Sequence, residues 1–299
     1  MRRCFASVSR RQKLCGWREV FCFRPALPAG RRSTGRRYPD RKVVGSVISD
    51  SDLVYMITLK SCPICKSSLI AQYPYIGIQP RVLHEIMPGV KTEAGIISYY
   101  FLCQNCHLIF QSPRLSNAEL DRFYGQGYYR RIVGKFDKQM DEGEKRRAKV
   151  DLEIIKKQIG IPASHLDIGC GRGYLLEAVG AKIKVGVESD VSYVRVKGIK
   201  VYSDINKVPQ KSFDLVSSVH VLEHVPYPLE YLKSIRRFVK NSGYLFLEVP
   251  TRESKGGPLR LQHLYFFEND VLKSVCSQAG FSVIQIGFTP HLVLICKKI

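Results

Sequence analysis

The sequence predicts an α/β fold, a doubly wound sheet with an antiparallel edge, preceded by a smaller unit. Three observations lead to this prediction. An apolar strand runs into a glycine-rich turn and a helical pattern at residues 165–175, HLDIGCGRGYL. Strand and helix patterns then alternate and close on two adjacent strands, 281–288 and 291–298. Upstream lie two Cys-x-x-C pairs. Alternating strands and helices are typical of a mostly parallel sheet covered by helices on both faces.

The glycine-rich turn is the most informative segment. Asp167 lies two residues before Gly169, and Gly171 and Gly173 follow. Glycines at a strand-to-helix turn let backbone N–H groups approach a ligand closely. The spacing is G-x-G-x-G, whereas the dinucleotide fingerprint is G-x-G-x-x-G. The turn therefore predicts a nucleotide-like ligand that is not a dinucleotide.

Further strands are expected to bring acidic residues to the same edge of the sheet. The strand 184–187 ends at Glu188, whose carboxylate could accept hydrogen bonds from two ribose hydroxyls. A lone acid at such a place is usually solvated, but its position after the glycine turn favours binding. A third strand, 200–202, precedes Asp204, and a fourth, 213–225, carries Glu223 and His224 at its end.

The predicted helices have apolar residues at helical spacing, which we interpret as core. One helix is expected over 138–160 with its charges solvated, one before the buried strand 244–249, and one from near Asn269 to Gly280. The apolar residues of the first two helices are Val150, Ile154, Ile155 and Ile159, then Leu229, Leu232, Ile235 and Phe238.

The glycine turn and the strands after it resemble the class I S-adenosylmethionine-dependent methyltransferases, whose first motif is D/E-x-G-x-G-x-G. The resemblance covers about 149–299 and implies a Rossmann-like seven-stranded sheet with S-adenosyl-L-methionine as the cofactor. It places Asp204 beside the adenine and the residues after Val219 near the sulfonium. The cofactor-binding residues that it implies are Asp167, Gly169, Gly171, Gly173, Glu188, Asp204 and His220.

The paired cysteines suit a structural zinc ion. Each Cys-x-x-C turn can present two thiolates to one side of a tetrahedral ion, and four thiolates leave no open position. The alternatives are two disulfides or chance clustering; nothing marks a secreted chain. The intervening residues 66–102 suggest short antiparallel strands, hence a zinc ribbon in which the metal supplies much of the folding free energy. The ligands would be Cys62, Cys65, Cys103 and Cys106.

The N-terminal segment is also similar to that of zinc-containing methyltransferases that act on sugars and other small metabolites, including deoxysugar C-methyltransferases. CPICKSS and CQNCHLIFQSPRL carry this resemblance, with His107 where the pattern has glycine. We expect His107 to be a surface residue. The resemblance makes Tyr128 and Tyr129 the tyrosines of a loop that closes over the substrate.

Methyl transfer needs a general base when the acceptor is a hydroxyl or a carbon acid. His263, His224 and Tyr129 are the catalytic candidates, and His263 is the first choice. In the deoxysugar enzymes the corresponding loop carries Tyr-x-Glu-His. Residues 260–263 keep only the histidine, which favours O-methylation over C-methylation. Each histidine has the alternative role of a hydrogen-bonded structural residue, and His224 could equally shape the pocket.

The net charge of +21 lies partly in an N-terminal extension, because residues 1–55 hold 13 Lys and Arg against 4 Asp and Glu. This stretch is interpreted as a disordered basic extension, a transit peptide or the result of a start codon assigned too early, and Met56 is favoured as the functional start. No apolar run approaches the ~18 residues of a membrane span. Ten cysteines and a thiolate metal site point to the cytoplasm, or to an organelle if residues 1–55 are a transit peptide.

The expected organisation is an extension (1–55), a zinc ribbon (56–118), a helical lid and linker (119–148) and the methyltransferase domain (149–299). We predict methylation of a small metabolite, such as a sugar or glycan precursor, with an anionic or nucleotide-linked acceptor as partner. One alternative is an RNA methyltransferase whose zinc ribbon holds RNA. It is disfavoured because the fourth strand lacks the Asn/Asp-Pro-Pro-Tyr of base-amine methyltransferases. The other alternative is a binding module without activity.

Overall fold

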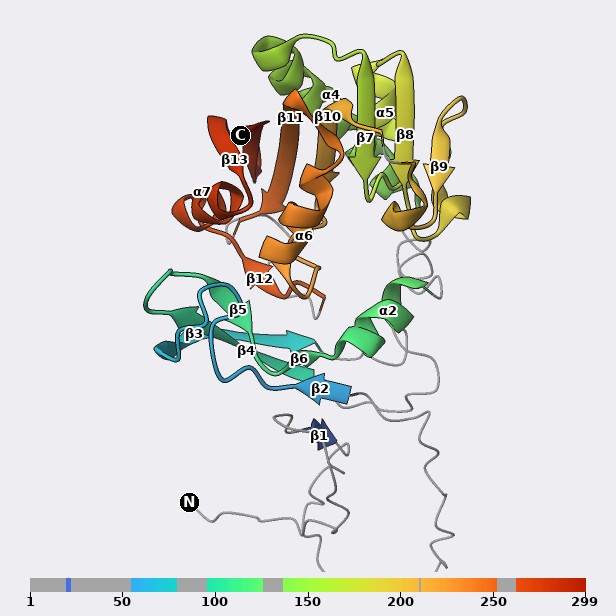
Figure 1. The fold of residues 1–299 in the computed structure, drawn as a ribbon. Helices are drawn as coiled ribbons and strands as arrows, with labels where there is room; N and C mark the ends of the chain where they lie inside the picture. The colour runs from blue at the N-terminus through green and yellow to red at the C-terminus, as the bar shows by residue number, and fades with distance from the viewer. Residues whose placement is uncertain (1–19, 23–54, 80–95, 126–136, 210, 252–261) are drawn as a thin grey trace, which may run out of the picture.

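The computed structural model describes residues 20–22, 55–79, 96–125, 137–209, 211–251 and 262–299, and it contains two units (Figure 1). One unit is a large sheet with helices, and the other is a smaller β-rich unit beside it. Tyr128, Tyr129 and nearly all of the extension 1–55 lie outside the described residues. Among the described residues, no helix has the length and apolar character needed to cross a membrane.

The large unit contains the predicted seven-stranded sheet, in the order β13-β14-β11-β10-β7-β8-β9. Neighbouring strands from β9 to β11 are parallel, and β14 runs antiparallel to both β11 and β13. The predicted antiparallel edge is therefore confirmed. The strands are β7 (Ser164–Ile168), β8 (Ile183–Val187), β9 (Lys200–Tyr202), β10 (Phe213–Val219), β11 (Val239–Pro250), β13 (Phe281–Phe288) and β14 (His291–Lys298).

Helices cover both faces of this sheet. Successive strand residues point to opposite faces, so neighbouring residues pack against different helices. Leu215 of β10 packs with α4 (Asp137–Ile159) and α5 (Tyr174–Val179). Its neighbour Val216 belongs to the core under α6 (Pro228–Arg236) and α7 (Asn269–Gln278). Short 3-10 turns at Val191–Tyr193 and Ile205–Lys207 follow β8 and β9.

Two expectations about these elements were wrong. The fourth strand ends at Val219 instead of continuing to 225, because His220 adopts a left-handed backbone with a φ of 54°. In α4 the buried face carries Ala148, Asp151 and Ile155, whereas Val150 is exposed. Ile154, Ile155 and Ile159 pack against the core as expected, so the expectation was wrong for Val150, and the polar Asp151 also lies on the inner face.

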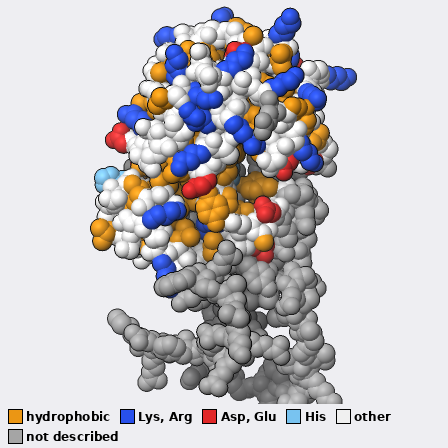
Figure 2. All heavy atoms as spheres, in the orientation of Figure 1, with side chains coloured by type: hydrophobic (Ala, Val, Ile, Leu, Met, Phe, Trp, Pro, Cys, Tyr) orange, Lys and Arg blue, Asp and Glu red, His pale blue; other side chains and the backbone are white. Residues whose placement is uncertain are grey.

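The smaller unit is built on a four-stranded antiparallel sheet, β12-β5-β4-β3. Its strand β12 (Tyr265–Phe266) comes from the segment after β11 and pairs with β5 (Ile109–Gln111). The two units thus share a sheet and one continuous apolar core. Figure 2 shows hydrophobic side chains gathered where the units meet. The remaining elements are β3 (Ile70–Gln79), β4 (Ile96–Cys103), the sheet of β1 (Val20–Cys22), β2 (Tyr55–Ile57) and β6 (Arg114–Leu115), and α2 (Asn117–Gly125).

Candidate functional site

The glycine-rich turn joins β7 to α5 through left-handed backbone conformations. Gly169, Gly171 and Gly173 have φ values of 72°, 53° and 88°, which favour glycine. A Cβ on Gly169 would lie 2.4 Å from Cγ2 of Val221. The turn therefore needs glycine for its conformation and, at Gly169, for the close approach of the chain that follows β10.

Glu188 lies where β8 ends and faces this turn. Its Oε2 accepts a hydrogen bond from the Gly171 N–H at 3.1 Å, and its Oε1 accepts bonds from Ser189 Oγ and the Asp190 N–H, both at 3.2 Å. Burial raises the pKa of the Glu188 carboxyl, and these hydrogen bonds partly offset that increase. The carboxylate is thus held against the glycine turn.

Asp167 ends a buried chain of hydrogen bonds across β7 and β10. Ser217 Oγ donates to Asp167 Oδ1 at 2.6 Å, so His165 Nε2 acts as the donor to Ser217 Oγ at 2.7 Å. Burial lowers the pKa of His165 to about 3, which keeps the ring neutral. Burial also raises the pKa of Asp167 to about 7. This carboxyl can therefore change its charge when a cation binds nearby.

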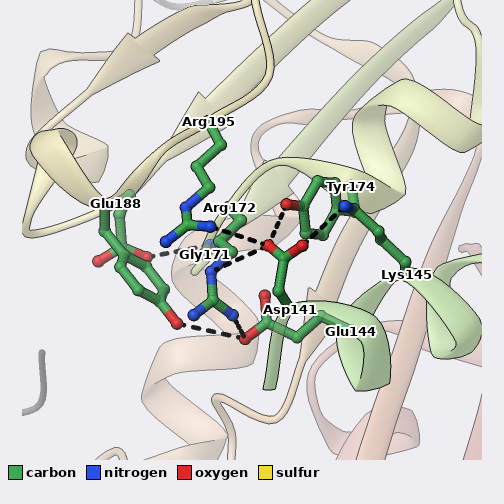
Figure 3. A network of polar contacts seen from close by, with 9 residues as sticks. Asp141, Glu144, Lys145, Gly171, Arg172, Tyr174, Glu188 and Arg195 are labelled. Atoms are coloured by element: carbon green, nitrogen blue, oxygen red, sulfur yellow. Dashed lines mark hydrogen bonds and ion pairs between the residues drawn. The ribbon is translucent and has the colours of Figure 1, made fainter. Parts of the chain in front are cut away.

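A group of charges fastens α4 to the glycine turn (Figure 3). The guanidinium of Arg172 is fully buried, and its Nη1 donates to Glu144 Oε1 at 2.7 Å. The Tyr193 ring stacks on it, with the Arg172 Cζ 4.6 Å from the ring centroid. Asp141, on the same helix, contacts Arg195 at 3.2 Å and accepts a hydrogen bond from Tyr174. We call Asp141, Glu144 and Arg172 the α4 clasp.

A cavity of about 590 Å³ opens beside the turn. This volume lies within the ~300–1,000 Å³ of small-molecule sites. The structure brings six of the seven predicted cofactor residues to its wall; Gly173 does not line it. The lining also includes His224 and several residues that the sequence did not single out. Those predicted are Asp167, Gly169, Gly171, Glu188, Asp204 and His220, and the additions include Asp121, Tyr124, Glu144, Arg147 and Asp151.

His220 and His224 also line the cavity, and the buried carboxylates Glu223 and Glu248 lie beside them. We call this part of the cavity and its surroundings the histidine side. His220 Nδ1 lies 3.3 Å from Glu223 Oε1, and its Nε2 lies 3.0 Å from Glu248 Oε1. Burial lowers the pKa of His220, but the hydrogen bonds to the two carboxylates outweigh burial and raise it overall. Burial alone would raise the pKa of Glu223, yet the neighbouring His224 and His220 lower it to about 2. Glu223 is therefore ionised.

His224 lines the cavity, whereas His263 lies behind it. His224 Nδ1 donates to the Gln262 carbonyl at 2.9 Å, and its Nε2 lies 3.5 Å from Glu223 Oε1. The His263 ring centroid is 4.8 Å from that of His224, and His263 is 6% exposed. The structure therefore brings together two of the histidines that were chosen as candidates from the sequence. Tyr129, the third candidate, lies outside the described residues, while Tyr124 packs edge-on against His224.

The four predicted metal-ligand cysteines also converge. Their sulfur atoms all lie within 4.8 Å of one another, with two pairs 3.5 Å apart. A tetrahedron with Zn–S bonds of 2.3 Å has sulfurs roughly 3.8 Å apart, so the arrangement fits zinc. The N–H groups of Lys66 and His107 close the two turns onto Cys62 and Cys103, with left-handed φ values of 63° and 60°. That conformation explains why glycine suits the position of His107, which is exposed.

Comparison with known proteins agrees with this geometry. The family model for the methyltransferase domain matches residues 129–286, more than half of the chain. A ubiquinone biosynthesis O-methyltransferase of Coxiella burnetii is 31% identical over 121 residues, covering 36% of this chain and 52% of that protein. The enzyme of the same name from Thiobacillus denitrificans is 30% identical over 106 residues, covering 30% and 45%. The chain thus spans about half the length of the curated relatives that it matches.

The solved structures that are similar to this chain include a Burkholderia thailandensis 1,6-didemethyltoxoflavin-N1-methyltransferase with bound S-adenosylhomocysteine. It is 20% identical, with a TM-score of 0.49, and the match covers 65% of this chain and 97% of that chain. A Thermotoga maritima methyltransferase is 24% identical, with a TM-score of 0.46, covering 56% and 99%. On the family match, the sheet order and the glycine turn, this chain belongs to the S-adenosylmethionine-dependent methyltransferases.

Proposed function

We propose that this protein transfers a methyl group from S-adenosylmethionine to a hydroxyl of a small metabolite. One observation carries the proposal. The cavity is lined both by residues of the cofactor motif and by His224, which has the ionised carboxylate of Glu223 beside it. The O-methyltransferase names of the partial relatives support oxygen as the methylated atom. The resemblance of the N-terminal segment to sugar-modifying enzymes supports a sugar or glycan precursor as the acceptor.

The residues around the glycine turn would hold the cofactor. The two oxygens of Glu188 would accept hydrogen bonds from the ribose hydroxyls, Asp204 would lie by the adenine, and Asp167 would face the ammonium group. When bound, S-adenosylmethionine supplies a methyl carbon activated by its sulfonium. The protein must then align the acceptor in line with that carbon and exclude water.

We assign the role of base to His224, because it lines the cavity. Donation from its Nδ1–H to the Gln262 carbonyl fixes the tautomer in which Nε2 can accept the proton of an acceptor hydroxyl. The Glu223 carboxylate, 3.5 Å from Nε2, would stabilise the imidazolium that results. His263, behind His224, would act as a positioning residue. This assignment changes the first choice made from the sequence.

We further propose that the four cysteines hold a structural zinc ion, which would stabilise the sheet containing β12. The Cys103 N–H bonds the Leu108 carbonyl just before β5, and β5 pairs with β12. Leu264, between His263 and β12, bonds both units: its carbonyl accepts from the Gln111 N–H and its N–H donates to the Glu223 carbonyl. Zinc would thus support the histidine side of the cavity from the smaller unit.

Calorimetric titration of the metal-analysed protein with S-adenosylhomocysteine tests the cofactor site. We expect one zinc per chain and binding that Glu188→Ala weakens roughly 100-fold or more, because two hydrogen bonds to a charged group contribute about 3 kcal/mol or more. Glu177→Ala, at an exposed position of α5, is the matched control and should bind normally. No binding to the folded, zinc-loaded protein would overturn the methyltransferase proposal.

An acceptor screen tests the substrate class. Labelled methyl transfer should be measured with nucleotide-linked sugars, ubiquinone-biosynthesis intermediates and RNA. Transfer to a sugar hydroxyl is the expected result, and transfer to RNA alone would overturn it. Cys103→Ser should release the zinc and lower the melting temperature. Full zinc content in this variant would contradict the assigned ligands.

A further inference from the structure

Three buried carboxylates meet on the histidine side of the sheet edge. Glu223 follows β10, Glu248 lies in β11 and Asp151 lies on α4, and each is at most 1% exposed. Each also has one oxygen that finds no hydrogen-bond partner among the described residues: Glu223 Oε2, Glu248 Oε2 and Asp151 Oδ1. Buried carboxylate oxygens are normally satisfied, and leaving one without a partner costs about 1–3 kcal/mol or more. Asp151 and Glu248 interact with each other, so the Glu248 oxygens beside the histidine nitrogens are the ones that could bind a cation.

Two cationic side chains lie near these carboxyl groups. Arg147 approaches Glu248 with an Nε–Oε1 distance of 3.9 Å, and His220 lies between Glu248 and Glu223. Burial and the neighbouring Glu248 raise the pKa of Asp151 to about 9, so Asp151 is mostly protonated at neutral pH. Glu223 and Glu248 are then the ionised carboxylates, and the His220 ring lies between them. Buried charges are stable only when they are paired or bound to a metal.

Two histidines and one of these carboxylates have the geometry of metal ligands. His220 Nε2 and Glu248 Oε1 lie 3.0 Å apart, and His291, the first residue of β14, completes a group whose ligand atoms lie within 4.8 Å of one another. The rings of His220 and His291 are perpendicular, with centroids 4.4 Å apart. Ligand atoms at bonds of about 2.1 Å lie roughly 3.0–3.4 Å from each other, so small side-chain movements would close the group around an ion.

The surroundings of His220 also fit a metal ligand. Its other ring nitrogen, Nδ1, lies 3.3 Å from Glu223 Oε1. A ligating histidine almost always donates its second N–H to a carboxylate or a carbonyl, which fixes the ring and its tautomer. The left-handed backbone of His220 lets the chain turn at the end of β10, and the ring lies between the two carboxylates.

We propose that His220, Glu248 and His291 form a second metal site, which takes a divalent first-row transition ion such as Zn²⁺. Imidazole and carboxylate ligands suit these ions, and three protein ligands leave a coordination position open. Of the three ligands, His220 lines the cavity, together with Arg147 and Asp151, so the site adjoins the cavity. The site differs from the four-cysteine cluster in its donor atoms, its open position and its place in the large sheet.

Titration with Co²⁺ of protein that holds a single zinc ion per chain, at the cysteines, tests the proposal without requiring methyl transfer. One additional equivalent should bind at micromolar concentration. Its weak visible absorption should lack the intense near-ultraviolet band of thiolate ligands, which separates it from exchange at the cysteines. Glu248→Gln and His291→Gln should each weaken this binding at least 10- to 100-fold. Glu177→Gln, a matched control on α5, should leave it unchanged.

Two more results decide the proposal. His224→Gln should retain the additional Co²⁺, because the neighbouring group Glu223, His224 and His263 is a different set of ligands. Loss of Co²⁺ in that variant, with retention in His291→Gln, would overturn the assigned ligands. If wild-type protein binds S-adenosylhomocysteine but takes up no additional equivalent of Co²⁺, the proposal is overturned. His220, Glu248 and His291 then form a hydrogen-bonded network without a metal ion. If Glu248→Gln fails to fold, His291→Gln alone decides, since His291 is only partly buried.

Discussion

The two sides of the cavity are built in different ways. The cofactor side comes from one run of sequence, from the end of β7 to the turn after β9, and Glu188 faces backbone N–H groups of its own neighbourhood. The histidine side joins the ends of β10 and β11, the start of β14 and the inner face of α4. Its carboxylates are buried beside histidines and keep oxygens without partners among the described residues.

This difference separates binding from chemistry. Fixed backbone geometry on the cofactor side suits a ligand that always binds in the same way. Buried ionisable groups that interact with one another, as on the histidine side, shift each other's pKa and can bind protons or metal ions. Substitutions on the cofactor side should therefore change the affinity for S-adenosylhomocysteine, whereas substitutions on the histidine side should change the turnover rate.

The largest effect is expected for His224→Gln. Loss of a general base lowers kcat roughly 10²- to 10⁴-fold, while affinity for S-adenosylhomocysteine should stay within about 2-fold. The pH profile of kcat, measured at saturating S-adenosylmethionine, should lose its acidic limb. His263→Gln should cost only about 10-fold, because His263 would act through His224. Equal or greater loss in His263→Gln, with activity retained in His224→Gln, would restore the choice made from the sequence and contradict our assignment.

Asp167 should make cofactor affinity depend on pH. Burial raises the pKa of its carboxyl to about 7 in the protein without ligand, and an ammonium group nearby would lower it. Binding should therefore release a proton, and affinity should rise with pH up to about 7, by at most about 10-fold per pH unit, and then level off. Calorimetry at pH 5.5–8.5 in buffers of different ionisation enthalpy measures both the affinity and the number of protons released on binding. The same slope in Asp167→Asn would show that another group titrates.

The cofactor side could be predicted from the sequence because its signals are local. Asp167, the glycines and Glu188 follow one another along successive strands, and the confirmed order of those strands brings them together. The histidine side could be predicted only in part. His220, His224 and His263 were recognised as candidates, but Glu248, His291 and Asp151 were not. No motif links these three residues, because they meet only through the pairing of β11 with β14 and the rotation of α4.

One local signal for that cluster was present in the sequence. Glu248 interrupts the apolar run 244–250 within a central strand, where a charge needs a partner. For Asp151 the signal was misleading, since the charges of α4 were expected to be solvated. Apolar spacing identifies the inner face of a helix only when that face is apolar. The inner face of α4 carries Arg147 and Asp151 of the cavity beside apolar residues such as Ala148 and Ile155.

The smallest effect is expected for the α4 clasp, which belongs to the cofactor side but is formed by a helix outside the motif. Glu144→Gln would remove the charge that pairs with the buried Arg172 guanidinium, 2.7 Å away, while keeping a hydrogen-bond acceptor. Since Arg172 lies between Gly171 and Gly173, a weaker pair should loosen the turn that meets Glu188.

For Glu144→Gln we expect a 3- to 10-fold loss of S-adenosylhomocysteine affinity, equivalent to roughly 1 kcal/mol, with kcat little changed. Glu153→Gln, at an exposed position of the same helix, is the matched control for calorimetry and thermal unfolding. A drop in kcat without loss of affinity would contradict the separation of the two sides, because it would show that a cofactor-side contact controls the chemistry. Unchanged affinity would mean that the turn keeps its shape through its glycines and backbone hydrogen bonds alone.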